Sequence, residues 1–99
     1  MAELEIEDTE VSEEFIRGMR DRMVVSFHKY GPVADAYPDK VDAIGSLMDR
    51  LRSYSMTGNT AYLMDAANFA MIEFMLPNHH NAHFAGTDDE DFPGRLARR

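Results

Sequence analysis

AYLMDAANFAMIEFML, the stretch at residues 61–76, decides the fold, because a helix of this sequence is apolar on nearly every side. The strongly polar residues within it are Asp65, Asn68 and Glu73. Asn59 or Thr60 stands where an N-cap is needed, and Pro77 cannot continue a helix. A helix is therefore predicted over residues 60–76, and it must be covered by protein on most of its sides.

A second helix is predicted upstream, over residues 12–30. Its apolar residues recur at spacings of three and four and share one face: Phe15, Met19, Met23, Phe27 and Tyr30. Ser12 is a typical N-cap, followed by two glutamates where the helix dipole favours negative charge. Gly31 can take the left-handed conformation that ends a helix, and the proline after it cannot extend one.

Between these two segments, a helix is predicted over residues 39–57, opened by Pro38 and Asp39. Its apolar residues also keep the helical period: Val41, Ile44, Leu47, Leu51 and Tyr54. Gly58 is expected to end it in the left-handed conformation.

The predicted fold is therefore all-α, with three main helices and a short C-terminal helical turn after Pro77. Residues 1–11 are expected to form a flexible acidic arm, 12–84 a single helical domain, and 85–99 a charged tail. Two amphipathic helices do not enclose an apolar third, so a homodimer is expected to complete a helical-bundle core. The alternative is a monomer in which Phe84, Phe92 and the N-terminal arm close the gap.

The charge balance excludes several classes of protein. The 99 residues carry 18 acids against 10 bases, a net charge of −8, which argues against general nucleic-acid binding and against anionic membrane surfaces. The chain has no cysteine, which excludes disulfides, thiolate catalysis and zinc–thiolate sites. No signal peptide or membrane span is expected, and a cytoplasmic location fits these features.

The polar residues of the 60–76 helix are the best candidates for a site. Asp65 and Asn68 are three residues apart and share a face, and a carboxylate on an apolar helix is costly to bury without a partner. One interpretation makes Asp65 a metal ligand with Asn68 beside it. The other pairs Asp65 with Arg50 or Arg52 of the preceding helix and gives Asn68 a structural role.

Further carboxylates precede them in the 39–57 helix, at Asp39, Asp42 and Asp49. Together with Asp65, two or three of these acids could hold Mg²⁺, which prefers oxygen ligands. The simpler interpretation makes Asp39 a helix cap and the other two part of a solvated face.

A histidine cluster follows Pro77, at His79, His80 and His83. The spacing of four between the first and the last could hold a transition metal if the segment were helical. The asparagines around them favour an exposed polar loop instead.

Three short motifs in this order, His28-Lys29-Tyr30-Gly31, Arg50-Leu51 and residues 65–70 (DAANFA), resemble the MazG-like all-α nucleotide pyrophosphohydrolase superfamily, closest to its phage, nucleotide-modification-associated relatives. The resemblance covers about half of the chain, from Phe27 to Met75.

In that family, acids on two consecutive helices bind Mg²⁺, which holds a nucleoside triphosphate while water cleaves between the α and β phosphates. The resemblance implies metal-binding roles for Asp65, Asn68 and, at a weaker match, Asp42. It implies phosphate contacts for Lys29, and for two further cations, Arg50 and Arg52. Ser46 and Ala61 stand where acids would be expected, so the resemblance implies a pyrophosphohydrolase with weakened or lost activity.

A second hypothesis needs no chemistry. The chain would be a non-catalytic helical interaction module, an accessory protein of a phage or mobile element, with its charged surface selecting a protein partner. The two hypotheses differ at Asp65, which the first places beside an acid of the preceding helix and the second pairs with an arginine.

Overall fold

The computed structural model describes residues 9–87, 94 and 97, and in this part of the chain all regular structure is helical. The elements are α1 (Glu13–Tyr30), a short 3-10 helix η1 (Val33–Asp35), α2 (Ala43–Thr57) and α3 (Ala61–Met75). The predicted all-α class with three main helices is confirmed. Most of the expected N-terminal arm, residues 1–8, lies outside the described residues, as does most of the C-terminal tail.

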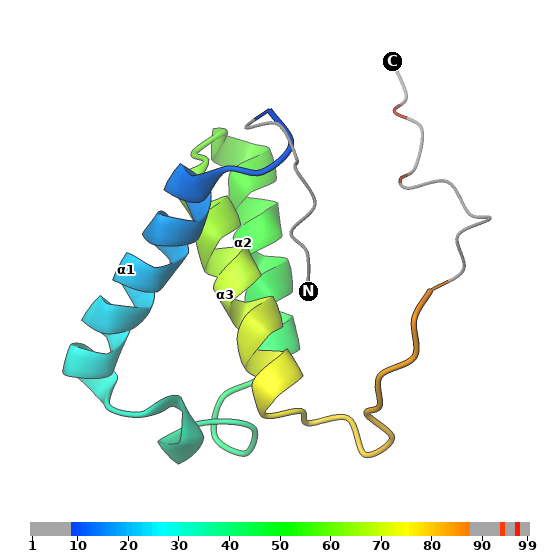
Figure 1. Ribbon diagram of the computed structural model, residues 1–99. Helices are drawn as coiled ribbons and strands as arrows, with labels where there is room; N and C mark the ends of the chain where they lie inside the picture. Colours follow the sequence, from blue (N-terminus) through cyan, green and yellow to red (C-terminus); the bar gives the residue numbers. More distant parts are fainter. Residues whose placement is uncertain (1–8, 88–93, 95–96, 98–99) are drawn as a thin grey trace, which may run out of the picture.

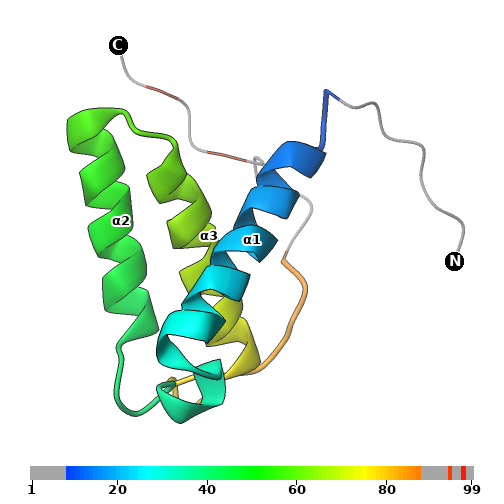
Figure 2. The same ribbon diagram turned by 90° about the vertical axis from the view of Figure 1, so that its left-hand side faces the viewer.

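α2 and α3 form an antiparallel pair, and α1 lies against α3 on another side (Figures 1 and 2). The loop between α2 and α3 is short because Gly58 takes the left-handed conformation, with φ 74° and ψ 8°, and its N–H donates to the Tyr54 carbonyl. A loop of this length folds the two helices back on each other.

The start of α1 agrees with the sequence. Ser12 is the N-cap, and its hydroxyl accepts a 3.0 Å hydrogen bond from the Phe15 N–H. Gly31 ends the helix with φ 88° and ψ −171°, so its φ is positive as expected but it does not take the left-handed helical conformation. L side chains rarely adopt this φ, and the Gly31 N–H donates to the Phe27 carbonyl.

The start of α2 differs from the prediction, which placed it at Asp39. The N–H groups of Lys40 and Val41 both donate to the Ala36 carbonyl, at 2.9 and 3.0 Å, so the chain is still in a turn there. Asp42 is the N-cap instead, and its Oδ1 accepts a 3.0 Å hydrogen bond from the Gly45 N–H. The cap therefore falls on the later aspartate, because the earlier one lies within this turn.

α3 begins one residue later and ends one residue earlier than predicted. The Asn59 Oδ1 accepts a 3.0 Å bond from the Ala61 N–H, whereas Thr60 makes no capping hydrogen bond with its side chain. After α3, the expected helical turn is a single hydrogen-bonded turn, in which the Ala82 N–H donates to the His79 carbonyl at 3.1 Å.

The buried core of the described residues is small. Its apolar members are Ala43, Ala66 and Ile72. Phe84, which the monomer alternative places over the gap, is 86% exposed and covers nothing, and Phe92 lies outside the described residues. No helix in the described part of the chain is long and apolar enough to cross a membrane.

Candidate functional site: a cationic pocket between α1 and α3

A pocket of about 750 Å³ lies between α1 and α3 and extends to Arg50 of α2 and Tyr37 of the α1–α2 loop. Its charged and amide side chains are Asp21, Arg22, Lys29, Arg50, Asp65 and Asn68. Four of these, from three helices, are site residues that the sequence suggested. Asp42 and Arg52 do not line it.

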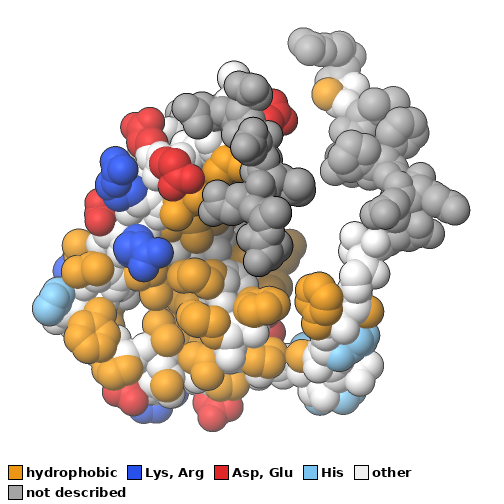
Figure 3. Space-filling model, viewed as in Figure 1, with side chains coloured by type: hydrophobic (Ala, Val, Ile, Leu, Met, Phe, Trp, Pro, Cys, Tyr) orange, Lys and Arg blue, Asp and Glu red, His pale blue; other side chains and the backbone are white. Residues whose placement is uncertain are grey.

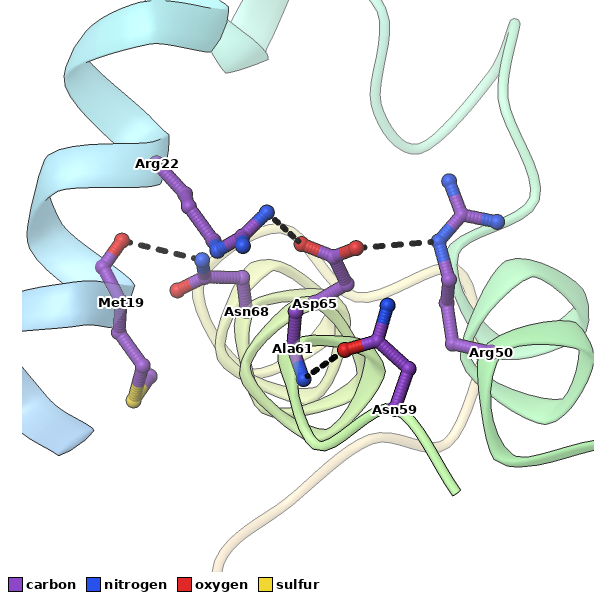
Figure 4. Close-up of polar contacts among 7 residues, drawn as sticks. All are labelled: Met19, Arg22, Arg50, Asn59, Ala61, Asp65 and Asn68. Atoms are coloured by element: carbon purple, nitrogen blue, oxygen red, sulfur yellow. Dashed lines mark hydrogen bonds and ion pairs between the residues drawn. The ribbon is translucent and has the colours of Figure 1, made fainter. Parts of the chain in front are cut away.

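Asp65 lies at the centre of the polar contacts, between α1 and α2 (Figure 4). Its Oδ1 is 3.3 Å from the Arg22 Nη1, and its Oδ2 is 3.5 Å from the Arg50 Nε. Both carboxylate oxygens therefore face guanidinium groups, and the carboxylate links all three helices. This is the arginine pairing that the second hypothesis expects, with Arg50 as the partner from the preceding helix.

Asn68 is 6% exposed and lies one helical turn after Asp65. Its Nδ2 donates a 3.0 Å hydrogen bond to the Met19 carbonyl, 49 residues away in the sequence, so the amide ties α3 to the backbone of α1 (Figure 4). Its Oδ1 has no hydrogen-bond partner among the described residues. A buried acceptor without a partner costs free energy of folding. The packing of α1 on α3 around Asn68 must therefore offset this cost.

Arg22 is the cation that the sequence analysis missed. It lies seven residues before Lys29 on α1, a spacing that puts both side chains on the same side of the helix. The sequence shows this spacing, but nothing in it indicates that α1 packs beside Asp65.

Aromatic rings complete the lining. The Arg50 guanidinium lies 5.4 Å from the centroid of the Phe69 ring, a cation–π contact that orients the arginine. Burial raises the pKa of the Tyr37 phenol above its ordinary value of 10.0, and the positive charge of Arg50 opposes this shift. Tyr37 comes from the loop after η1, and nothing in the sequence pattern marks it as part of a site.

The other acidic candidates have different roles. Asp42 caps α2 through Gly45, and Asp49 pairs with Arg52 at 3.1 Å on an exposed part of α2. Glu73 accepts a 2.8 Å hydrogen bond from the Asn78 N–H and so holds the chain after α3. None of these acids lines the pocket beside Asp65.

The histidines lie in the exposed turn after α3. His79 and His80 stack with their ring centroids 5.1 Å apart, and the His79 Nδ1 accepts a 3.0 Å hydrogen bond from the Asn81 N–H. His83 approaches the Asn81 carbonyl with its own Nδ1, at 2.9 Å. The Nδ1 atoms of His79 and His83 are therefore already in contact with the backbone of Asn81.

The donor set does not fit a magnesium site. Among the described residues, no group of three or more histidine or acidic side chains is placed to hold a metal ion. In the pocket, both oxygens of Asp65 are already opposite arginines. The magnesium that the resemblance implies stays a prediction.

Comparison with known proteins does not assign the chain to a family. No protein-family model, no curated protein and no solved structure matches this chain. The resemblance to MazG-like proteins therefore stays a prediction based on the three short motifs.

Proposed function

We propose that the protein binds a nucleoside phosphate in the cationic pocket, with Arg22, Lys29 and Arg50 as the phosphate contacts. The observation that carries the proposal is the convergence of Lys29 and Arg50 with Asp65 and Asn68 on one pocket. These residues come from three helices, and each of them belongs to one of the three short sequence motifs.

The charge of the pocket supports an anionic ligand. Its cations are Arg22, Lys29 and Arg50, against the carboxylates of Asp21 and Asp65, a surplus of one positive charge in a chain of net charge −8. Guanidinium groups donate paired hydrogen bonds to phosphate oxygens.

The aromatic lining supports a ligand with a flat ring. Tyr30, Tyr37 and Phe69 line the same pocket as the three cations. The face of such a ring can stack on a nucleobase, as aromatic side chains do on the bases of single-stranded nucleic acids. A volume of about 750 Å³ falls in the range of small-molecule sites.

The proposal is binding rather than cleavage. The pyrophosphohydrolase reaction that the resemblance implies depends on a carboxylate cluster for magnesium, whereas the contacts proposed here depend only on cations and rings. Whether a bound nucleotide is also cleaved is measured in the same experiment.

The test is calorimetric titration of the purified protein with a panel of deoxynucleoside triphosphates, with and without Mg²⁺, followed by a pyrophosphate-release assay. We expect binding that does not require Mg²⁺, weakened about tenfold by Arg50→Gln, because a charge-assisted contact is lost. Arg52→Gln is the matched control: it removes the same charge from the same helix, but Arg52 lies outside the pocket beside Asp49.

Asp65→Asn separates this proposal from a magnesium site. Removing the carboxylate frees Arg22 and Arg50, so anion binding without Mg²⁺ should tighten. A metal site would instead lose Mg²⁺-dependent binding in this variant. Absence of binding heat in the wild-type protein, or equal losses in Arg50→Gln and Arg52→Gln, would refute the pocket.

The second candidate is the non-catalytic interaction module, and a different observation favours it. Large apolar side chains are exposed on all three helices, among them Phe27, Met48 and Phe74. Exposed apolar surface on this scale is typical of a protein that associates with another chain. This function would be favoured if the calorimetric titration showed no binding heat, the assay showed no pyrophosphate release, and a protein partner were captured.

A further inference from the structure

The side of α3 that faces away from the pocket is apolar along its whole length. Leu63, Ala67, Ala70 and Phe74 follow one another at spacings of four, three and four, and so form one stripe, which we name the outer stripe. On the helical wheel it lies opposite Asp65 and Asn68, which point toward α1. Phe74 is 76% exposed, and no charged residue belongs to the stripe.

Apolar residues of α1 extend this surface. Figure 3 shows hydrophobic side chains gathered across α1 and α3 on the face seen in Figure 1, with most charged side chains toward the rim. A groove of about 560 Å³ runs along α1, lined by Met23, Val24 and Phe27 among others. On the helical wheel of α1, Phe27 lies on the side opposite to Arg22 and Lys29. The groove and the cationic pocket nevertheless share Met23, Ser26 and Val33 in their linings.

The small core explains why this face needs a cover. No large side chain of the described residues is fully buried, although 44% of the chain is hydrophobic. Apolar burial contributes roughly 25 cal/mol per Å² and is the main term that offsets the entropy of folding. A second surface on the outer stripe would supply burial that the single chain lacks.

We infer that the outer stripe pairs with the outer stripe of a second copy of this chain, antiparallel, about a two-fold axis between Ala67 and Ala70. The order of the residues is self-complementary. Leu63 and Phe74 lie at equal distances on either side of that midpoint. Leu63 of one chain would therefore contact Phe74 of the other, and the reverse. The alanines at the crossing point let the two helix axes approach closely.

Two aromatic side chains supply about a third of the area that an interface needs. Phe27 and Phe74 expose 55% and 76% of their surfaces, together about 250 Å² for aromatic side chains of roughly 200 Å² each. A stable interface buries about 800 Å² per partner, so the rest must come from the other residues of the stripe and the apolar residues of α1.

The lack of charge favours a second copy over an unrelated protein. Specific partners are commonly selected by opposite charges, and the outer stripe offers none. Two copies of net charge −8 repel each other elsewhere, so an uncharged stripe is where they can approach.

The first test is the molar mass in solution over a dilution series. We expect the wild-type chain at twice 11.3 kDa, dissociating on dilution, and Phe74→Glu at the monomer mass with retained helical circular dichroism. Met56→Glu is the matched control, since Met56 is 80% exposed but lies at the end of α2, outside the stripe. A wild-type monomer at every concentration would overturn the inference.

A crosslinking test fixes the geometry and does not depend on the folding of Phe74→Glu. The chain has no cysteine, so Leu63→Cys with Phe74→Cys in one chain introduces the only thiols. Mild oxidation should join two such chains in high yield. Leu63→Cys alone should not crosslink, because the antiparallel pairing keeps the two copies of residue 63 far apart. Equal crosslinking of the single and double variants, or none in the double variant, would overturn this pairing.

Discussion

The two sides of α3 contrast. On the pocket side, Asp65 and Asn68 have partners within the chain, from Arg22, Arg50 and the Met19 carbonyl. On the outer side, the stripe from Leu63 to Phe74 faces away from α1. The Asp65 carboxylate and the Asn68 Nδ2 therefore have partners within one chain, whereas the apolar Phe74 stays 76% exposed. The two sides of the same helix therefore differ in what the single chain covers.

The helices differ in the same way. α2 and α3 contribute the buried residues, whereas no residue of α1 is buried. Polar contacts from Met19 and Arg22 connect α1 to α3, and polar contacts are net weaker than apolar burial of a large side chain. We expect α1 to be the first helix to separate from the other two.

The largest effect is expected inside the core. Ile72→Ala should lower the free energy of unfolding by about 3 kcal/mol, because it leaves a cavity between packed helices. Phe74→Ala, on the outer stripe, should cost less than about 1 kcal/mol in dilute protein and more as concentration rises. Urea unfolding at two protein concentrations measures both, and equal, concentration-independent losses would contradict the contrast between the two sides.

A smaller effect is expected at the contact between α1 and α3. Asn68→Ala removes the amide that binds the Met19 carbonyl and should cost about 1–2 kcal/mol. Amide hydrogen exchange should rise in α1 more than in α2. Asn81→Ala, in the exposed turn after α3, is the control and should change neither quantity. Equal exchange in α1 and α2 would show that Asn68 does not secure α1.

The cap of α2 offers a matched pair of aspartates. Asp42→Ala should destabilise the protein by about 1 kcal/mol, because the Gly45 N–H loses its acceptor. Asp39→Ala should have little effect, since residue 39 lies within the turn before the cap and not at the start of the helix. Thermal unfolding of the two variants decides between them, and the reverse order would restore the helix start that the sequence suggested.

The smallest effect concerns pH. Burial raises the pKa of Tyr37 in the folded chain above 10.0, so the folded state holds the phenolic proton more tightly than the unfolded state does. This contribution to stability is fully present below pH 10 and is lost as pH rises through the folded pKa. The urea midpoint should fall more steeply above pH 10 in the wild-type protein than in Tyr37→Phe. Identical profiles would contradict this role of burial.

The sequence by itself determined the three helices, both ends of α1 and the end of α2. Ser12, Gly31 and Gly58 act through the backbone of their own segment, so their roles follow from local order. Local order failed at the start of α2, because the N–H groups of Lys40 and Val41 bond back to Ala36, which depends on the path of the whole loop.

Only the tertiary structure decided the partners. The sequence placed Asp65 beside either acids or arginines, and the packing of α1 and α2 on α3 brought Arg22 and Arg50 to its two oxygens. It also brought Lys29 and Tyr37 to the same pocket from separate segments. The physical reason is range: caps and helical periods act over a few residues, whereas ion pairs and pockets join groups that only the packing of helices brings together.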